Sequence, residues 1–249
     1  MAVNHQAAGE QGLAFLLFIT ILDKLIGLKQ YGESPDSCCS CSCSASSAGD
    51  NINSSSYGLS WRLAVEANNV GPWRTVPIEC FPYIETYMSG GQYYQDLKLI
   101  TDQILSYVNE IDLKNDGMDA WVLDVDDTCI SNILYYKGRK YGSDPFDSTA
   151  FKAWILKGVC PAIHAVLELY NKLICRGFKV FFITGRDQHT LAKATIHNLH
   201  NQGFIAYERL ILRNVAYKGQ SAVRYKSETE EADRRRRVQN MGKCGRPME

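Results

Sequence analysis

The chain has 249 residues, of which 45% are hydrophobic and 22% are charged, so it can bury one good core and a small accessory region. Its 27 lysines and arginines balance 27 aspartates and glutamates, and the run Arg234 to Arg237 stands alone as a basic block. This balance argues against nucleic acid, or another polyanion, as a partner.

An apolar run, Gly12 to Leu22, lies near the N-terminus. It is long enough for the hydrophobic part of a signal peptide but short for a membrane span, so no stable span is expected. Glu10 precedes the run and no Lys or Arg does, which differs from the usual flank of a signal. A secretory signal and a buried helix therefore both stay open.

Residues 31–57 are rich in Ser, Cys, Asp and Gly and contain little apolar surface to bury. This composition predicts a flexible linker, which together with the apolar run forms an N-terminal region of residues 1–58. The four cysteines between Cys38 and Cys43 are too closely spaced for an ordered disulfide framework, and no histidine follows at zinc-finger spacing. A redox or metal-binding role for these cysteines is an alternative that rests on local composition alone.

Residues 59–115 form the next region, which is predicted to be helical. Between Tyr83 and Ile111, apolar residues recur near helical spacing and Gly90-Gly91 interrupts them. This pattern predicts two helices whose apolar faces pack against the domain that follows.

The run Trp121 to Thr128 predicts a buried strand that ends in two carboxylates, Asp124 and Asp126. Because strand side chains alternate between faces, both project on one side, at the edge where open parallel sheets bind ligands. Two like charges this close require a cation such as Mg2+ or a shared proton, so both are candidate Mg2+ ligands. Asp124 could then attack phosphorus as a nucleophile while Asp126 donates and accepts the proton. The alternative is a surface turn whose acidic residues face solvent.

A second apolar run, Phe178 to Ile183, ends in Thr184, Gly185 and Arg186 and predicts another strand with a hydroxyl at its tip. Thr184 could hydrogen-bond a phosphoryl oxygen, and Gly185 would let the backbone come close to it. Arg186 and the Thr128 hydroxyl complete the set of expected substrate contacts. The alternative is an ordinary junction between a strand and a turn.

The segment Ser131 to Pro145 suits a loop or a short cap beside the site, in which tyrosines 135 and 136 are expected to pack rather than to contact substrate. Helices are predicted at Phe151–Leu156, at Pro161–Cys175 with Pro161 in the first turn, and at His189–Gln202. The alternation of strand and helix predicts a doubly wound α/β fold with a parallel sheet.

Together these motifs resemble the haloacid dehalogenase superfamily, and residues 60–228 are similar to plant acid phosphatases and vegetative storage proteins. The similarity is carried by Ser60-Trp61-Arg62-Leu63, Arg74-Thr75-Val76-Pro77, Gly117-Met118-Asp119-Ala120-Trp121, Ser131-Asn132, Tyr141-Gly142-Ser143 and Tyr225-Lys226-Ser227-Glu228. It implies a phosphatase core at residues 116–228 that hydrolyses small phosphomonoesters through an aspartyl phosphate with Mg2+. A vacuolar or extracellular location is also implied, and a homodimer stays open.

The resemblance assigns roles to four residues. Asp124 matches the phosphate-accepting nucleophile, Asp126 the acid and base, Thr184 the phosphate-binding hydroxyl, and Lys226 the lysine that steadies the phosphoaspartate. The alternative function is that of a storage protein of the same lineage without significant catalysis.

The resemblance stops after Glu228, where the family continues with a strand ending in Gly-Asp-Gln-Trp-Ser-Asp that is absent from residues 229–249. Codons can be chosen for Arg237 to Glu249 that encode a different peptide when they are translated from one base later. That peptide is Gly-Tyr-Arg-Ile-Trp-Gly-Asn-Val-Gly-Asp-Gln-Trp. Met241 and Met248 each have a single codon, and both contribute to the tryptophans of that reading. We therefore expect residues 229–249 to be an aberrant tail from a displaced frame, the last core strand to be missing and the catalysis to be impaired.

Overall fold

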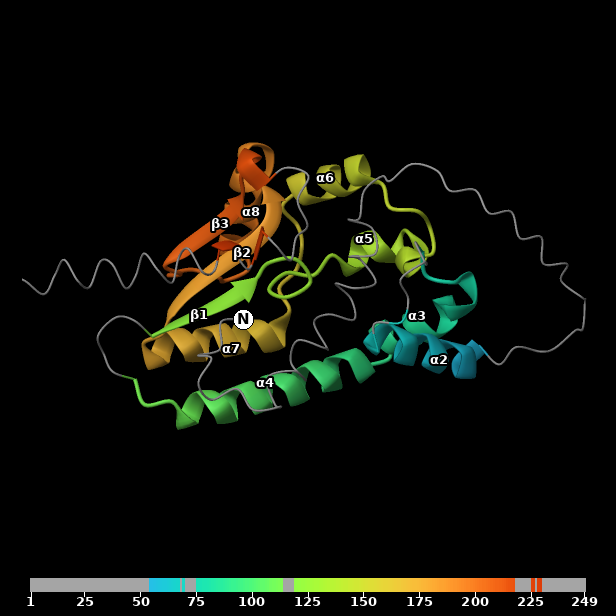
Figure 1. Ribbon diagram of the computed structural model, residues 1–249, viewed down its shortest axis with the longest axis horizontal. Helices are drawn as coiled ribbons and strands as arrows, with labels where there is room; N and C mark the ends of the chain where they lie inside the picture. Colours follow the sequence, from blue (N-terminus) through green and yellow to red (C-terminus); the bar gives the residue numbers. More distant parts are fainter. Residues whose placement is uncertain are drawn as a thin grey trace, which may run out of the picture.

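The computed structural model describes residues 54–67, 69, 75–113, 119–217, 225–226 and 228–229 (Figure 1). The predicted signal run 12–22 and the tail beyond residue 229 lie outside these residues, as does the predicted linker 31–57 apart from its last four residues. Those four form the first turn of a helix, so the helical region begins earlier than predicted. Within the described ranges, no helix has both the length and the hydropathy that a membrane crossing needs.

The centre of the fold is a parallel three-stranded sheet with the order β1-β2-β3. Its strands are β1 (Ala120–Asp124), β2 (Lys179–Asp187) and β3 (Arg209–Arg213). The first two confirm the predicted strands. The third was not predicted, because a five-residue run with an arginine at each end and half-exposed side chains carries little strand signal. Its pairing with β2, where Phe182 lies opposite Leu210, makes it a strand.

The helices are α2 (Ser54–Glu66), α3 (Phe81–Ser89), α4 (Gln92–Glu110), α5 (Ile133–Lys137), α6 (Ser148–Leu156), α7 (His164–Arg176) and α8 (Gln188–Asn201), with short 3-10 turns η1 (Ile78–Cys80), η2 (Lys140–Gly142) and η3 (Val215–Tyr217). The predicted break at Gly90-Gly91 separates α3 from α4, and Gly91 has φ +94°. The prediction that Pro161 lies in the first turn of a helix is wrong. Ala162 pairs with Ile130 in an isolated bridge, so α7 starts only at His164.

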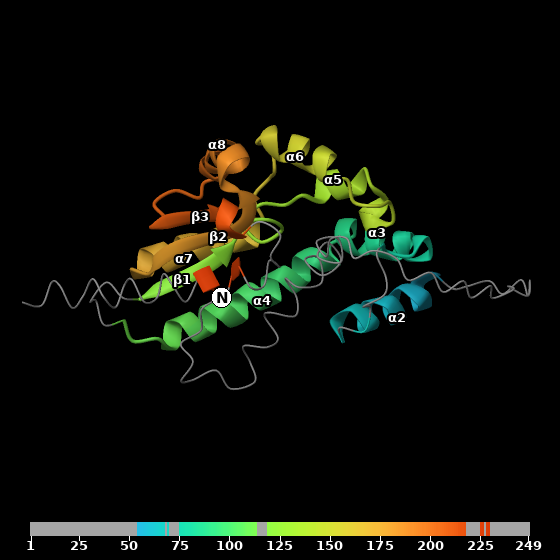
Figure 2. The ribbon, with the colours of Figure 1, turned by 45° about the horizontal axis from the view of Figure 1, so that its top comes forward.

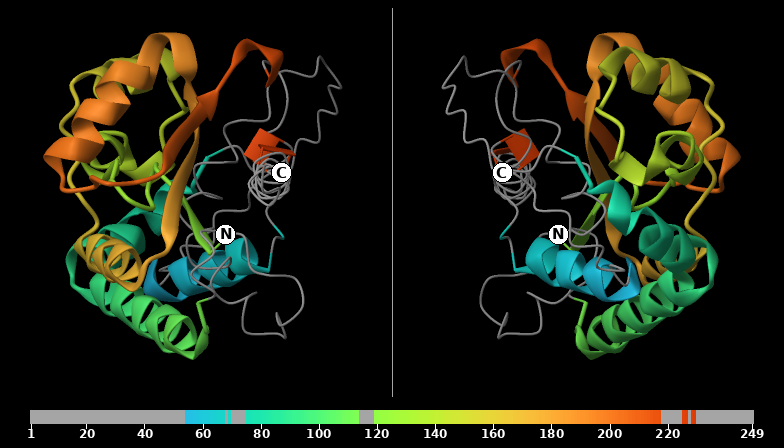
Figure 3. Two further views of the ribbon diagram at one scale, coloured as in Figure 1. Left: turned by 90° about the vertical axis from the view of Figure 1, so that its left-hand side faces the viewer. Right: turned by 90° about the vertical axis from the view of Figure 1, so that its right-hand side faces the viewer.

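Both crossovers, β1 to β2 and β2 to β3, step in the same direction across the sheet. Because parallel crossovers are right-handed, this places α7 and α8 on one face (Figure 3). On that face Phe182 packs against Tyr170 of α7 and against Phe204, which follows α8. The opposite face is covered in the described residues by a small cluster around Tyr225. The parallel α/β fold is confirmed, and its described helical layer lies on one side.

The N-terminal helices divide between two cores (Figure 2). Helix α4 packs on α7 and contributes Ile100, Ile104 and Val108 to the main core, as the helical pattern predicted. Helices α2 and α3 instead build a second cluster with the segment after β1, where Tyr136 and Tyr141 are buried. Tyr136 therefore serves packing, and the N-terminal helices support the segment that leads away from the first strand tip.

Candidate active site

The carboxylate of Asp124 lies at the end of β1 and forms an ion pair with Lys226. The distance from Asp124 Oδ2 to Lys226 Nζ is 2.7 Å, and the two side chains are 18% and 35% exposed. Lys226 reaches this edge because the neighbouring Tyr225 is buried against Val122 and Ile183 on the sheet. The structure thus brings together two residues that are 102 positions apart in the chain, with the carboxylate open enough for a ligand to reach it.

A tight turn follows β1 and aims the next side chains. The amides of Cys129 and Ile130 donate to the carbonyl of Val125, and the amide of Asp127 donates to the carbonyl of Ile130. Asp127 has φ +55°, a left-handed conformation that an aspartate tolerates better than most residues. The hydroxyl of Thr128 is buried by this turn and has no hydrogen-bond partner among the described residues. It therefore faces inward and not toward an open substrate site.

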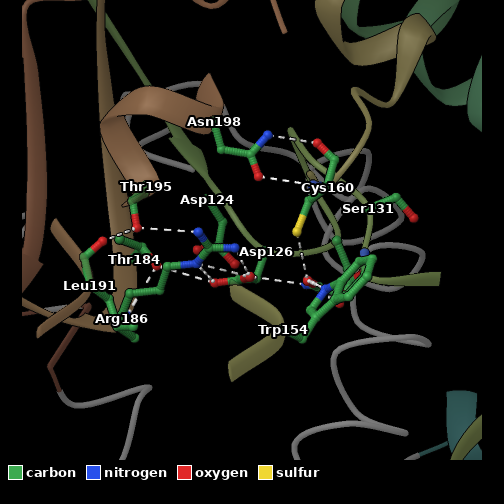
Figure 4. Close-up of polar contacts among 12 residues, drawn as sticks. Asp124, Asp126, Ser131, Trp154, Cys160, Thr184, Arg186, Leu191, Thr195 and Asn198 are labelled. Atoms are coloured by element: carbon green, nitrogen blue, oxygen red, sulfur yellow. Dashed lines mark hydrogen bonds and ion pairs between the residues drawn. The ribbon is translucent and has the colours of Figure 1, made fainter. Parts of the chain in front are cut away.

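Asp126 is held by Arg186, a side chain that is almost fully buried (Figure 4). Arg186 Nη2 lies 2.7 Å from Asp126 Oδ1, and Arg186 Nε donates to Oδ2 at 3.0 Å. The remaining nitrogen, Nη1, donates to the hydroxyl of Thr195 on α8 at 3.2 Å. The guanidinium is thus used in orienting Asp126, whereas the sequence suggested that it contacts substrate.

This ion pair controls the charge of Asp126. Burial favours the neutral carboxyl, but the charge and hydrogen bonds of Arg186 outweigh it, and the pKa of Asp126 is lowered. Asn132 and Lys226 act in the same direction. The carboxylate is therefore ionised over most of the acidic range, which suits a group that takes a proton from water.

Thr184 lies at the tip of β2 and is fully buried. Its hydroxyl accepts from the Arg186 amide at 3.1 Å and donates to Asp126 Oδ2 at 3.3 Å, a long bond that a phosphoryl oxygen could replace. At Gly185, a Cβ atom would meet nothing within 4 Å, so packing does not require the glycine. The space at its Cβ position is therefore open, and a ligand could approach the backbone there.

Asn132 is a central residue to which the sequence assigned no role. It is fully buried, and its side-chain amide donates to Asp126 Oδ1 at 2.9 Å and to Asp127 Oδ2 at 3.2 Å. Its amide oxygen accepts from the indole of Trp154 at 3.0 Å. One signal could have found it, since Asn132 belongs to the Ser131-Asn132 pair that carries part of the family resemblance. An asparagine six residues after an aspartate is not by itself a recognisable motif.

Asp127 is expected to be protonated at acidic pH. Burial raises its pKa to about 7, and the charges of Asp126 and Asp124 add to this, while two hydrogen bonds from Asn132 oppose it. A raised pKa means that the stability contributed by the proton is complete below the ordinary value of 3.8 and is lost as the pH rises through about 7. In a 13C NMR titration, one aspartate carboxyl should titrate near 7 and disappear in Asp127→Asn. The exposed Asp147, whose pKa is lowered by two backbone amides, is the control. A midpoint near 4 for Asp127 would contradict the expectation.

The donors at this edge suit Mg2+ in kind but are few in number. Mg2+ prefers oxygen ligands, and proteins often hold it by one or two carboxylates together with water and substrate phosphate. Asp124 can supply a carboxylate oxygen, whereas the carboxylate of Asp126 is occupied by Arg186, Asn132 and Thr184. Over the described ranges, no group of three or more His, Cys, Asp or Glu side chains could hold a metal. A Mg2+ ion here would be bound by few protein groups.

The sequence of this chain is similar to those of several known proteins. A family model described as the HAD superfamily, subfamily IIIB (acid phosphatase), matches residues 43–242. Acid phosphatase 1 of Solanum lycopersicum is 40% identical over 70% of this chain and 68% of its own length. The stem 28 kDa glycoprotein of Glycine max is 38% identical over 69% of this chain and 67% of its own length. Vegetative storage protein 1 of Arabidopsis thaliana is 33% identical over 62% of this chain and 57% of its own length.

Proposed function

Because the chain belongs to subfamily IIIB of the HAD superfamily, the acid phosphatases, we propose that its site hydrolyses small phosphomonoesters through an aspartyl phosphate on Asp124. The observation that supports this most is the 2.7 Å ion pair between Asp124 and Lys226 at the carboxyl end of β1. A lysine at that distance would offset the charge of the phosphoryl group after transfer to Asp124.

The proposed reaction has two steps. In the first, a carboxylate oxygen of Asp124 bonds to phosphorus, the ester bond breaks, and the leaving oxygen takes a proton from Asp126. In the second, water attacks the phosphorus of the aspartyl phosphate, its proton passes to Asp126, and Asp124 is released with inorganic phosphate. The Thr184 hydroxyl would turn from Asp126 to a phosphoryl oxygen. The ion pair with Arg186 stabilises the ionised carboxylate, which is the form of Asp126 that the first step leaves and from which the second step starts.

Mg2+ is the metal proposed for this site. Asp124 would hold it through its carboxylate and Asp126 through its main-chain carbonyl, with water and the substrate phosphate completing the ligand set. When bound, Mg2+ would neutralise charge on the phosphoryl oxygens. The residues of the chain then bind the phosphate, hold the nucleophile and move the proton.

The relatives support a location in the secretory pathway. One of them is named a stem glycoprotein and another a vegetative storage protein, so we propose a vacuolar or extracellular protein. The storage protein also supports the alternative function, in which the chain accumulates without significant catalysis. Measured turnover separates the two functions.

The tail is part of the proposal because it bears on activity. We propose that residues 229–249 arise from a displaced reading frame and that the acidic strand of the family, absent from this stretch, leaves the Mg2+ site short of a ligand. Sequencing the transcript around the codon of Glu228 tests the first half. The proposal fails if no displaced frame encodes the Gly-Asp-Gln-Trp segment.

The covalent intermediate can be tested directly. A version with the frame restored, mixed with an aryl phosphate and Mg2+ and quenched in acid, should carry one phosphate that is sensitive to hydroxylamine. Mass spectrometry after borohydride reduction should place it on Asp124, and Asp124→Asn should show none. Label on another residue, or turnover without label in rapid-quench samples, would rule out Asp124 as the nucleophile.

A further inference from the structure

Asn132 connects the carboxylates of Asp126 and Asp127 through every donor that it has. Its backbone amide donates to Asp127 Oδ1 at 2.7 Å, and its side-chain amide donates to Asp126 Oδ1 and to Asp127 Oδ2. Arg186 holds the same Asp126 carboxylate from the other side. The direction in which Asp126 points is therefore set jointly by one guanidinium and one amide.

The orientation of this amide is itself held from outside the strand tip. Asn132 Oδ1 accepts from Trp154 Nε1 at 3.0 Å and from the thiol of Cys160 at 3.4 Å. An indole nitrogen can only donate, so a flipped amide would face the indole with its own donor and would turn its oxygen toward two carboxylates. Trp154 thus determines which end of Asn132 faces Asp126.

These contacts link separate parts of the fold. Trp154 lies on α6, while Asn132 precedes α5 and its carbonyl accepts from the amides of Tyr135 and Tyr136. Helix α5 and the turn after it pack on α2 and α3, and the Val76 amide donates to the Gly142 carbonyl at 3.0 Å. A displacement of α6 or of the N-terminal helices would therefore reach Asp126 through a single amide.

We infer that Asn132 is a positioning residue, oriented by Trp154, that couples the segment between β1 and β2 to the proton-transfer carboxylate Asp126. The claim that Asn132 affects catalysis rests on the proposed function. The claim that Trp154 and Asn132 orient Asp126 does not. If Asn132 had a purely structural role, its buried side-chain amide would only need hydrogen-bond partners. A positioning role requires that losing the Trp154 donor changes the contact between Asp126 and Arg186.

The chain offers a matched pair of substitutions. Trp154→Phe keeps a ring and removes the N–H that orients Asn132. Trp121→Phe makes the same chemical change in the core at β1, where the indole N–H is buried and has no partner among the described residues. Equal effects of the two would reflect lost packing, whereas unequal effects would reflect the hydrogen bond.

The measurement is solvent exchange of the Arg186 Nε–H in 15N NMR of the whole chain as written, assigned with Arg186→Lys. Trp154→Phe should speed this exchange by at least about tenfold, the effect expected for one lost buried hydrogen bond, and Trp121→Phe should change it by less than about twofold. If Trp154→Phe does not fold, Asn132→Ser removes the amide itself and should speed the exchange by at least about tenfold. No change in the folded Trp154 variant, or the same change in both tryptophan variants, overturns the inference.

A kinetic measurement tests whether the contact between Trp154 and Asn132 affects catalysis. In the frame-restored chain, Trp154→Phe should lower kcat by about tenfold and leave KM within about twofold, since substrate binding does not involve the amide. An increase in KM without a change in kcat would contradict a positioning role. If the restored parent shows no turnover at all, the proposed function fails, and the exchange measurement still decides the contact.

Discussion

The chain as written should hydrolyse a generic aryl phosphate barely above background, and a version with the frame restored should gain at least about a hundredfold. In the proposed mechanism, Asp124 is the nucleophile, Lys226 is its countercharge and Thr184 contacts the phosphate. Without a further acidic ligand, however, a bound Mg2+ would be held by few groups, and the charge on the transferring phosphoryl group would be poorly compensated. Removing a comparable preorganised electrostatic element costs on the order of 3 to 4 kcal/mol.

The controls for this result follow from the mechanism. The gain in the restored chain should require Mg2+, should be abolished by a chelator and should disappear in Asp124→Asn. Lys226→Met should lose most of it, because the carboxylate would lose its nearest positive charge. Strong Mg2+-dependent turnover by the unrestored chain would contradict the expectation, since another acidic group would then have to complete the site.

Arg186→Met should be among the most destabilising single substitutions in the chain. It leaves the Asp126 carboxylate, which is only 22% exposed, without its partner, and breaking a buried pair in this way costs about 3 kcal/mol or more. Urea unfolding of the chain and the variant at pH 7 measures the difference. The effect is large because Asp126 would either stay ionised with Lys226 as its remaining opposite charge or bind a proton at pH 7, well above its ordinary pKa of 3.8.

Two further measurements separate this explanation from a general loss of packing. Asp126→Asn in the Arg186→Met background should recover part of the loss, because it removes the stranded charge. The pKa of Asp126 is lowered in the folded chain, so its contribution to stability is present above its ordinary value of 3.8 and is lost as the pH falls. The difference between parent and variant should therefore shrink in acid. Lys98→Met, which breaks an exposed pair with Asp102, should change stability little.

The residues of the site that lie at strand ends could be predicted from the sequence. Asp124 and Asp126 follow a short apolar run, and Thr184 follows another, so a local pattern with a period of two locates them at the carboxyl edge of a parallel sheet. The resemblance added Lys226, whose ammonium lies 2.7 Å from the carboxylate of Asp124. The predictions of Asp124, Asp126 and Thr184 depend on a few neighbouring residues, which is why they needed no tertiary information.

The partners of Asp126 depended on tertiary structure. Arg186 was expected near substrate, yet it is buried against Asp126 because α8 supplies Thr195 for its far nitrogen. Asn132 meets Trp154 across 22 positions and Cys160 across 28. Such contacts between distant side chains leave no periodic trace in the chain, since they arise only when helices pack on a sheet. The sequence by itself determined which groups could perform the chemistry, and only the packing decided which of them hold the others in place.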